Sequence, residues 1–368
     1  DRLFSSYSRG MKILVIGAGV AGLAIGWRLA EAGQEVLILE RGQPGRGATW
    51  ASAGMLAVTA ELQNSHPDEI EFARYSNVLW PNFAKQIEDL SGQNIGFAPH
   101  GALILAEDVI ALAGLERQIV QPDSVLVGAD RVREIAPLVT AGIAGGLWSP
   151  HEAWVDNQRL ALALAAAFHK SGGRVLANEA VVRIERDGGR AVAVRTPFGL
   201  YPADAIILAA GAWSGLVEPA VAPVVPVKGQ MILLTPPPDQ SPPAAVIWGS
   251  GIYAVPRGRA LAIGATVEAV GFDTALTDEG RDGLRHAAEG LMPALKNWTL
   301  SDHWAGLRPR SPDGLPLLGP TAVDGLWLAS GQYRNGILFA PAVAETMCNQ
   351  VLGSTSVIPA FDPRRFAA

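Results

Sequence analysis

Three glycines near the start of the chain have the spacing of a turn that binds a dinucleotide. Gly17, Gly19 and Gly22 follow an apolar, β-branched run, 12–16, and precede a segment with helical spacing, 20–32. In such a turn the first glycine allows the tight bend, the second lets the backbone approach a pyrophosphate, and the third lets helix and strand pack closely. The amino end of the helix then faces the phosphates with a partial positive charge. The alternative is a tight glycine turn without a ligand.

An acidic residue favours the first interpretation. Glu40 ends a second buried run, 36–39, and lies 40 − 22 = 18 positions after the last glycine of the turn. A carboxylate at this place can accept hydrogen bonds from the two hydroxyl groups of a ribose. The strands, the helix and the acid together predict a dinucleotide site, but they do not separate NAD from FAD.

The loop 44–55 is unusually poor in large side chains, so its backbone amides can approach a ligand closely. The alternative is a flexible surface loop, for which Trp50 and Met55 are unusual residues.

Composition excludes several classes of function. The only cysteine, Cys348, rules out a disulfide framework and any site built from several cysteines, and it fits a reducing compartment. The six histidines (66, 100, 151, 169, 286 and 303) show no metal spacing, so we expect no metal site. A net charge of −6 argues against binding to nucleic acid. No apolar run reaches the ~18 residues of a membrane span, so we expect a soluble, cytoplasmic protein.

The elements that must position these residues change in character along the chain. A length of 368 residues suggests two domains. Buried strands near the start, in the middle and at the end are separated by long alternating strands, which indicates two interleaved domains. We expect a helix over 69–90 that is interrupted at Pro81, a strand over 245–256, and helices over 277–295 and 337–351.

Four segments, taken in order, carry a resemblance to a known superfamily. They are the glycine turn with Glu40, ATWASAGML at 48–56, ILAAGAWS at 207–214, and the pair WAGLRP at 304–309 and YRNGILFAP at 333–341. From about residue 11 to residue 350 the chain resembles the D-amino-acid oxidase and sarcosine oxidase superfamily of flavoenzymes. The string GATVEAVGFD at 264–273 favours the glycine oxidase branch, which belongs to thiamine biosynthesis.

The resemblance implies an α/β fold, α+β overall, with a Rossmann-like FAD-binding domain interleaved with an antiparallel-sheet substrate domain. We expect the FAD-binding domain at 11–81, 151–215 and 305–360, and the substrate domain at 82–150 and 216–304. Residues 1–10 are interpreted as an extension or a tag.

The resemblance also implies an FAD cofactor held by residues from several segments. The glycine turn with Val20, Ala21, Glu40 and Arg41 is expected to hold the ADP half, and Val181 to contact the adenine. The flavin and its ribityl chain are expected to be lined by Ala48, Thr49, Ala53, Gly54 and Met55, and Gly211 is a further expected cofactor residue. The pyrimidine side of the flavin is expected to be covered by Tyr333, Arg334, Asn335, Gly336, Ile337 and Leu338. A helix beginning near Asn335 would stabilise negative charge on reduced flavin. Some relatives attach the flavin to a cysteine after the segment matching 304–309; this chain has none there, so we expect non-covalent FAD.

For the substrate, the resemblance makes Arg308 the clamp that holds a carboxylate, and Tyr253 a phenol that hydrogen-bonds the same group. Arg308 offers a bidentate fork and precedes Pro309, which favours an extended backbone. Without the resemblance, Arg308 would be interpreted as a surface arginine in an ion pair, and Tyr253 as a half-buried aromatic residue on a strand. Met55 and Arg334 are further candidates for substrate contact, although a purely structural role for Arg334 is equally open.

The expected reaction is oxidative deamination of a small amino acid, with glycine favoured, by hydride transfer from the α-carbon to flavin N5 and reduction of O2 to H2O2. Such a reaction needs positioning more than a strong base. Arg310 and Gln332 depart from the pattern of glycine oxidases, so sarcosine, a D-amino acid, or a larger or β-amino acid stays open. A dehydrogenase subunit that passes electrons to a partner protein, a tRNA-modifying flavin module and an NAD-linked dehydrogenase also stay open. We also expect a homo-oligomer.

Overall fold

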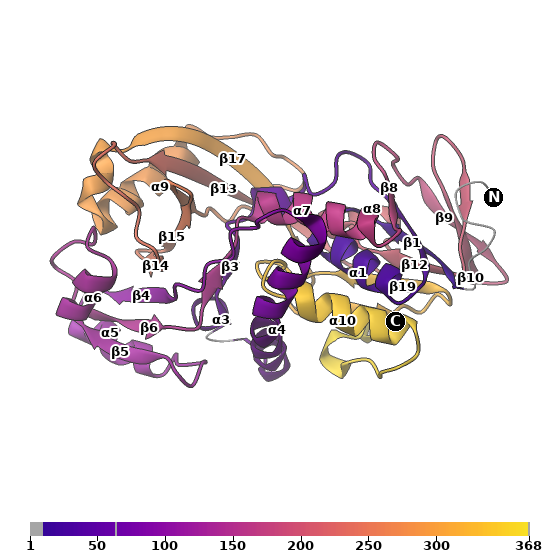
Figure 1. Cartoon of the computed structure of the whole chain (residues 1–368), viewed down its shortest axis with the longest axis horizontal. Helices are drawn as coiled ribbons and strands as arrows, with labels where there is room; N and C mark the ends of the chain where they lie inside the picture. Colours follow the sequence, from indigo (N-terminus) through magenta and orange to yellow (C-terminus); the bar gives the residue numbers. More distant parts are fainter. Residues whose placement is uncertain (1–9, 63–64, 367–368) are drawn as a thin grey trace.

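The computed structural model describes residues 10–62 and 65–366. Most of the predicted extension, residues 1–9, therefore lies outside the described residues. Within the described part, the strands form sheets of six, eight, three and two strands. The two large sheets stand next to each other along the long axis of the molecule, with the helix α4 (Pro67–Ser91) between them (Figure 1). The predicted α/β class is confirmed.

The six-stranded sheet is assembled from three separate parts of the chain, in the order β18-β19-β12-β1-β2-β8. All neighbouring strands are parallel except β18 and β19. The strands are β1 (Lys12–Ile16), β2 (Glu35–Leu39), β8 (Arg174–Leu176), β12 (Ala205–Leu208), β18 (Leu317–Pro320) and β19 (Leu326–Ser330).

Both faces of this sheet are covered, which explains why its strands are apolar throughout. Alternate residues of β1 enter two different cores: Ile13 and Val15 pack with the helices, and Leu14 and Ile16 pack on the opposite face. The first face is covered by α1 (Val20–Glu31), α7 (Asn157–Lys170) and α10 (Ala340–Val351), and the second by β9 (Arg183–Asp187), β10 (Arg190–Arg195) and β11 (Leu200–Pro202).

The eight-stranded sheet has the order β17-β13-β16-β15-β14-β4-β6-β5 and is antiparallel except where β14 meets β4. Helices α6 (Ala129–Ile135) and α9 (Asp278–Leu291) pack on one face, and Met231 and Tyr253 point to the other. Its strands are β4 (Ala102–Ala106), β5 (Val125–Gly128), β6 (Gly145–Ser149), β13 (Val225–Thr235), β14 (Val246–Gly249), β15 (Ile252–Arg257), β16 (Ala260–Gly264) and β17 (Thr299–Arg310).

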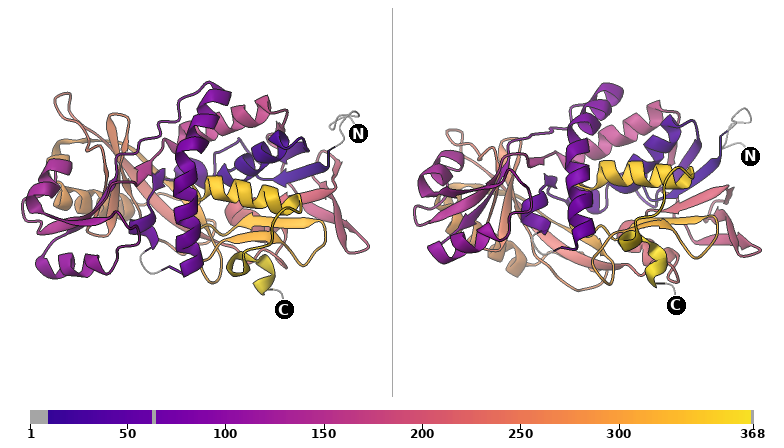
Figure 2. Two further views of the ribbon diagram at one scale, coloured as in Figure 1. Left: turned by 60° about the horizontal axis from the view of Figure 1, so that its bottom comes forward. Right: turned by 90° about the horizontal axis from the view of Figure 1, so that it is seen from below.

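The expected interruption at Pro81 is wrong, because α4 runs unbroken through it and ends at Ser91, capped by Gly92. Pro81 lies on the exposed face, where water can satisfy the carbonyl group that loses its amide partner. The opposite face is buried through Phe72, Trp80 and Phe83, and this packing holds the helix together. Figure 2 shows α4 upright between the two large sheets, with α10 reaching from it across the six-stranded sheet.

Two more expected elements differ from the structure. The single strand expected over 245–256 is the hairpin of β14 and β15, which turns at Ser250 and Gly251 with positive φ angles of 48° and 76°. The helix expected over 277–295 ends at Leu291 and is followed by the 3₁₀ turn Pro293–Asn297.

Shorter elements complete the chain. They are α2 (Ala48–Ala51), β3 (Met55–Leu56), α3 (Val58–Leu62), α5 (Val109–Glu116), β7 (Ala153–Trp154), the 3₁₀ turn η1 (Gly211–Trp213), α8 (Ser214–Val217), and the 3₁₀ turns at Pro359–Phe361 and Pro363–Phe366. Strand β17 continues across residues 304 and 305, so the domain boundary expected there falls inside a strand and the division into domains stays a prediction. None of the helices in the described residues is both long and apolar enough to span a membrane.

Candidate functional site

The glycine turn after β1 has the geometry that its spacing predicts. Gly17 has φ +104°, and a Cβ atom there would lie 2.6 Å from the Ala209 carbonyl oxygen. A Cβ atom on Gly22 would lie 2.0 Å from the Gly17 carbonyl oxygen, so α1 can approach the turn only with glycine at this position. Gly19 caps α1 and is not required by packing, because its Cβ atom would meet only the Thr49 hydroxyl at 3.5 Å. The space beside Gly19 is therefore open to a ligand.

Glu40 lies at the end of β2 and holds the turn with its side chain. Its Oε2 accepts a hydrogen bond from the Ala18 amide at 2.8 Å, and its Oε1 accepts one from the Gly42 amide at 2.9 Å. Each carboxylate oxygen has a second acceptor position that can receive a ribose hydroxyl group. The acid therefore holds the turn, and its contact with a nucleotide stays a prediction.

A cavity of about 460 Å³ extends from this turn to the eight-stranded sheet. It is lined by most of the residues expected to hold a cofactor, together with Arg308 and Tyr253. The expected residues on its wall are Gly17, Gly19, Val20, Ala21, Glu40, Arg41, Ala48, Thr49, Ala53, Gly54, Met55, Val181, Gly211, Tyr333, Arg334, Asn335, Gly336 and Ile337.

Two expected cofactor residues do not line this cavity. Gly22 lies behind the turn, where it packs against Gly17. Leu338 is buried, and its carbonyl oxygen accepts hydrogen bonds from the Trp80 indole at 2.8 Å and the Ser76 hydroxyl at 2.6 Å. Its carbonyl group is therefore used to hold α4.

The loop of small residues after β2 is fixed by hydrogen bonds. The side-chain amide of Asn157 donates to the carbonyl oxygens of Thr49 and Trp50 at 2.7 and 2.9 Å, and Arg257 donates to that of Ser52 at 3.0 Å. Because α7 and β15 both hold this segment, it forms a rigid wall of the cavity.

Arg308 extends from β17 across the face of β13. A Cβ atom on Gly229 of β13 would lie 2.3 Å from Nη2 of Arg308, so the guanidinium rests directly on this glycine. Nη1 donates to the Thr266 carbonyl oxygen at 3.1 Å and to the Lys228 carbonyl oxygen at 3.4 Å. No carboxylate in the described part of the chain lies within ion-pair distance of Arg308, so its charge is left for a ligand.

Tyr253 lies beside Arg308 and rests on a glycine in the same way. A Cβ atom on Gly264 would lie 2.5 Å from the tyrosine ring, and the tyrosine hydroxyl is 3.9 Å from the Met231 sulfur. Burial raises the pKa of Tyr253, and the neighbouring charge of Arg308 opposes this shift. The phenol therefore keeps its proton near neutral pH and can donate a hydrogen bond.

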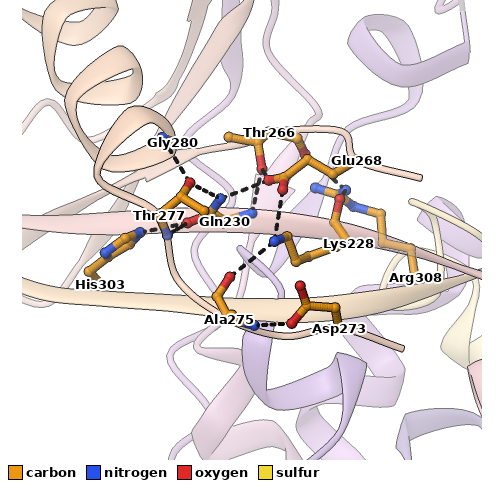
Figure 3. A network of polar contacts seen from close by, with 10 residues as sticks. All are labelled: Lys228, Gln230, Thr266, Glu268, Asp273, Ala275, Thr277, Gly280, His303 and Arg308. Atoms are coloured by element: carbon orange, nitrogen blue, oxygen red, sulfur yellow. Dashed lines mark hydrogen bonds and ion pairs between the residues drawn. The ribbon is translucent and has the colours of Figure 1, made fainter. Parts of the chain in front are cut away.

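A buried polar network holds the segment that accepts from Arg308 (Figure 3). Lys228, whose side chain is 2% exposed, forms an ion pair with Glu268 at 2.8 Å and donates to the Ala275 carbonyl oxygen at 3.0 Å. Gln230 donates to Glu268 at 2.8 Å and to the Thr277 hydroxyl at 2.9 Å. Partial burial acts to raise the pKa of Glu268, but the hydrogen bonds from Gln230 and Lys228 outweigh this effect, so the pKa of Glu268 is lowered. This network fixes residues 266–277 against β13, and with them the Thr266 carbonyl.

Glu61, for which sequence reasoning predicts no role, lies in the wall of the cavity. Its Oε2 is 3.1 Å from Nε of Arg334, and its side chain is 7% exposed. Burial raises the pKa of Glu61, against the charges of Arg334 and Arg308. Glu61, Gly229 and Gly264 are the important residues that sequence reasoning missed, because only the folded chain brings them to Arg308 and Tyr253.

The expectation of a helix beginning near Asn335 is wrong, since α10 begins at Ala340. A separate turn precedes it, in which the Phe339 amide donates to the Asn335 carbonyl oxygen at 2.8 Å and Tyr333 has a positive φ of 45°. The helix-dipole argument therefore does not apply to Asn335, although residues 332–337 still line the cavity. Of the two departures from the glycine oxidase pattern, Gln332 lines the cavity, and Arg310 lies 5.6 Å above the ring of Tyr333.

The chain matches one protein family over nearly its whole length, the family described as FAD dependent oxidoreductase, at residues 12–350. It is 37% identical to the glycine oxidase of Pseudomonas aeruginosa, with 97% of this chain and 98% of that protein aligned. It is 36% identical to the bifunctional protein ThiO/ThiG of Trichormus variabilis over 94% of this chain, which spans 53% of that relative. The crystal structure of glycine oxidase from Geobacillus kaustophilus superimposes with a TM-score of 0.91 and 29% identity, covering 97% of this chain and 99% of that one. No group of three metal-binding side chains occurs among residues 10–62 and 65–366.

Proposed function

The chain belongs to the family of FAD-dependent oxidoreductases, and from this premise we propose that it oxidises a small amino acid, with glycine as its leading substrate. The relatives named as glycine oxidases support the choice of substrate. One observation carries the proposal: Arg308 reaches, without a carboxylate partner among the described residues, into the same cavity that begins at the glycine turn. A group that binds a carboxylate and a cradle for a dinucleotide thus share one space.

The residues of the cavity fit FAD. The open space beside Gly19 and the acceptor positions of Glu40 suit a pyrophosphate and a ribose. Val181, Gly54 and Gly211 line the same cavity. Cys348 is buried and is not part of this wall, which favours non-covalent binding.

FAD bound here would supply the acceptor, at N5, for a hydride from the substrate α-carbon; with loss of a proton from the amine the substrate would become an imine, and O2 would take up the two electrons and two protons to give H2O2. The chain's own residues hold the amino acid for this step. Arg308 donates two parallel hydrogen bonds to the substrate carboxylate. Tyr253 donates a third, because its pKa is raised. With both groups rigidly supported from the sheet, the α-carbon is held in one orientation, and this removes much of the entropic cost of the reaction.

The test is a panel of amino acids given to the purified, FAD-loaded protein. We expect oxygen uptake and stoichiometric peroxide with glycine, and weaker activity with sarcosine, D-alanine, D-proline and β-amino acids. A panel in which glycine is inactive, while a larger amino acid is turned over, would overturn the choice of substrate. Reduction of the flavin by glycine with little peroxide formed in air would instead indicate a dehydrogenase that passes its electrons to a partner protein.

A further inference from the structure

The charged groups at the Arg308 end of the cavity form a compact set of two cations and one anion. Arg308 and Arg334 are the cations, and Glu61 is the anion. Glu61 is paired with Arg334 at 3.1 Å, whereas Arg308 donates to backbone carbonyl oxygens and hydrogen-bonds the uncharged Tyr253 phenol. The set therefore carries one positive charge that is not neutralised by a side chain.

The remaining charged side chains on the cavity wall are committed elsewhere. Glu40 accepts from the amides of the glycine turn. Arg41 lies 3.5 Å above the Trp213 ring, and Arg46 lies 3.5 Å above the Trp50 ring. Glu179 is buried and accepts from the hydroxyls of Tyr201, at 2.9 Å, and Thr196. Of the charged residues on the cavity wall, three therefore set the charge at the Arg308 end, and Glu152, which is not part of the wall, interacts electrostatically with Glu61.

We propose that Glu61 restricts this site to substrates with one carboxylate, because it cancels the charge of Arg334 and leaves Arg308 as the single available cation. A bound monocarboxylate makes the set neutral. A second anionic group would leave a buried charge without a partner, which is strongly unfavourable. This inference deepens the proposed function and rests on it.

The decisive variant is Glu61→Gln, which keeps the shape of the side chain and frees Arg334. The FAD-loaded protein is titrated with malonate, a dianion, and separately with acetate, a monoanion. The change in the flavin spectrum gives the Kd of each. Because burial raises the pKa of Glu61, the titrations are run at a series of pH values, and wild type and Glu61→Gln are compared at each. Glu71→Gln, on the exposed face of α4, changes the net charge equally and serves as the control.

We expect Glu61→Gln to shift the ratio of the malonate and acetate Kd values at least about tenfold toward malonate, since two charges at contact distance interact strongly in a buried site. The double variant Glu61→Gln with Arg334→Gln should return the ratio to the wild-type value. Arg334→Gln alone should weaken the binding of acetate as well as that of malonate. The same shift should appear in kcat/KM for D-aspartate against its neutral isostere D-asparagine.

An unchanged malonate to acetate ratio in Glu61→Gln would overturn the inference, as would an equal shift in Glu71→Gln. If Glu61→Gln does not fold, the Arg334→Gln variant still tests the inference. Unchanged acetate binding in Arg334→Gln would contradict the charge balance among Glu61, Arg308 and Arg334. The titrations do not depend on turnover. If no amino acid is oxidised but the ratio shifts, the proposed function fails while the charge rule stands.

Discussion

Replacing Gly229 by alanine should impair the reaction while leaving the fold intact. The new Cβ atom would lie 2.3–2.5 Å from three atoms of the Arg308 guanidinium, and ordinary contact begins at 3.4 Å. The guanidinium must therefore move by roughly 1 Å, a displacement that can cost on the order of 100-fold in rate at a reacting centre. This corresponds to about 2.7 kcal/mol of transition-state stabilisation. Because the displaced atoms end a flexible side chain, the free energy of unfolding should change little.

The assay is oxygen uptake at varied glycine concentration, compared with the thermal unfolding midpoint and the FAD content of the same preparations. Gly128→Ala is the matched control, since this glycine ends β5 at the far edge of the same sheet and its Cβ atom would meet open space. We expect kcat/KM to fall about 100-fold in Gly229→Ala and to stay unchanged in Gly128→Ala. A kcat/KM within about threefold of wild type in Gly229→Ala would refute the account of how Arg308 is placed.

Three further predictions concern the cofactor and pH. Glu40→Ala should weaken FAD binding by about tenfold or more, because the variant loses both a ribose acceptor and the hydrogen bonds that hold the turn. The fluorescence of free flavin on dilution measures the loss of affinity, and Glu40→Gln should lose less FAD affinity than Glu40→Ala. Heat or acid denaturation should release all flavin into the supernatant, and flavin that stays with the precipitated chain would contradict non-covalent binding. Burial raises the pKa of Glu152 from 4.5 to about 7, against a hydrogen bond from the Thr59 amide. Unfolding between these two pH values therefore releases a proton, so the free energy of unfolding should fall as pH rises across this window, by about 3 kcal/mol in total. Glu152→Gln should reduce this slope in denaturant titrations at a series of pH values.

The geometry of the glycine turn could be predicted because its causes are local in sequence. The spacing of Gly17, Gly19 and Gly22 follows from the geometry of one turn, and Glu40 from the length of one strand–helix–strand unit. Most of the expected cofactor residues accordingly line the cavity. Where tertiary packing outweighs local preference, the predictions failed: Pro81 does not break α4, since the buried face of the helix holds it.

The substrate end could be predicted only through the resemblance, and in part not at all. Gly229 matters because β13 pairs with β17 in a register that brings it under Arg308, and no local pattern encodes that register. Gly264 lies under Tyr253 for the same reason, since β16 pairs with β15. Glu61 meets Arg334 from a position far away in the chain. Such contacts follow from strand register and domain packing rather than from spacing.

The central claim is that Arg308 holds the carboxylate of an amino acid for oxidation by bound FAD, and anaerobic reduction of the flavin tests it most directly. Glycine is mixed with the FAD-loaded protein in the absence of oxygen, and the loss of flavin absorbance is followed in the wild type and in Arg308→Ala. We predict rapid bleaching in the wild type and a second-order rate constant for reduction that is more than tenfold lower in the variant, since a lost bidentate charge pair costs several kcal/mol. A wild-type flavin that glycine does not bleach, or an Arg308→Ala rate constant within about tenfold of wild type, would contradict the account.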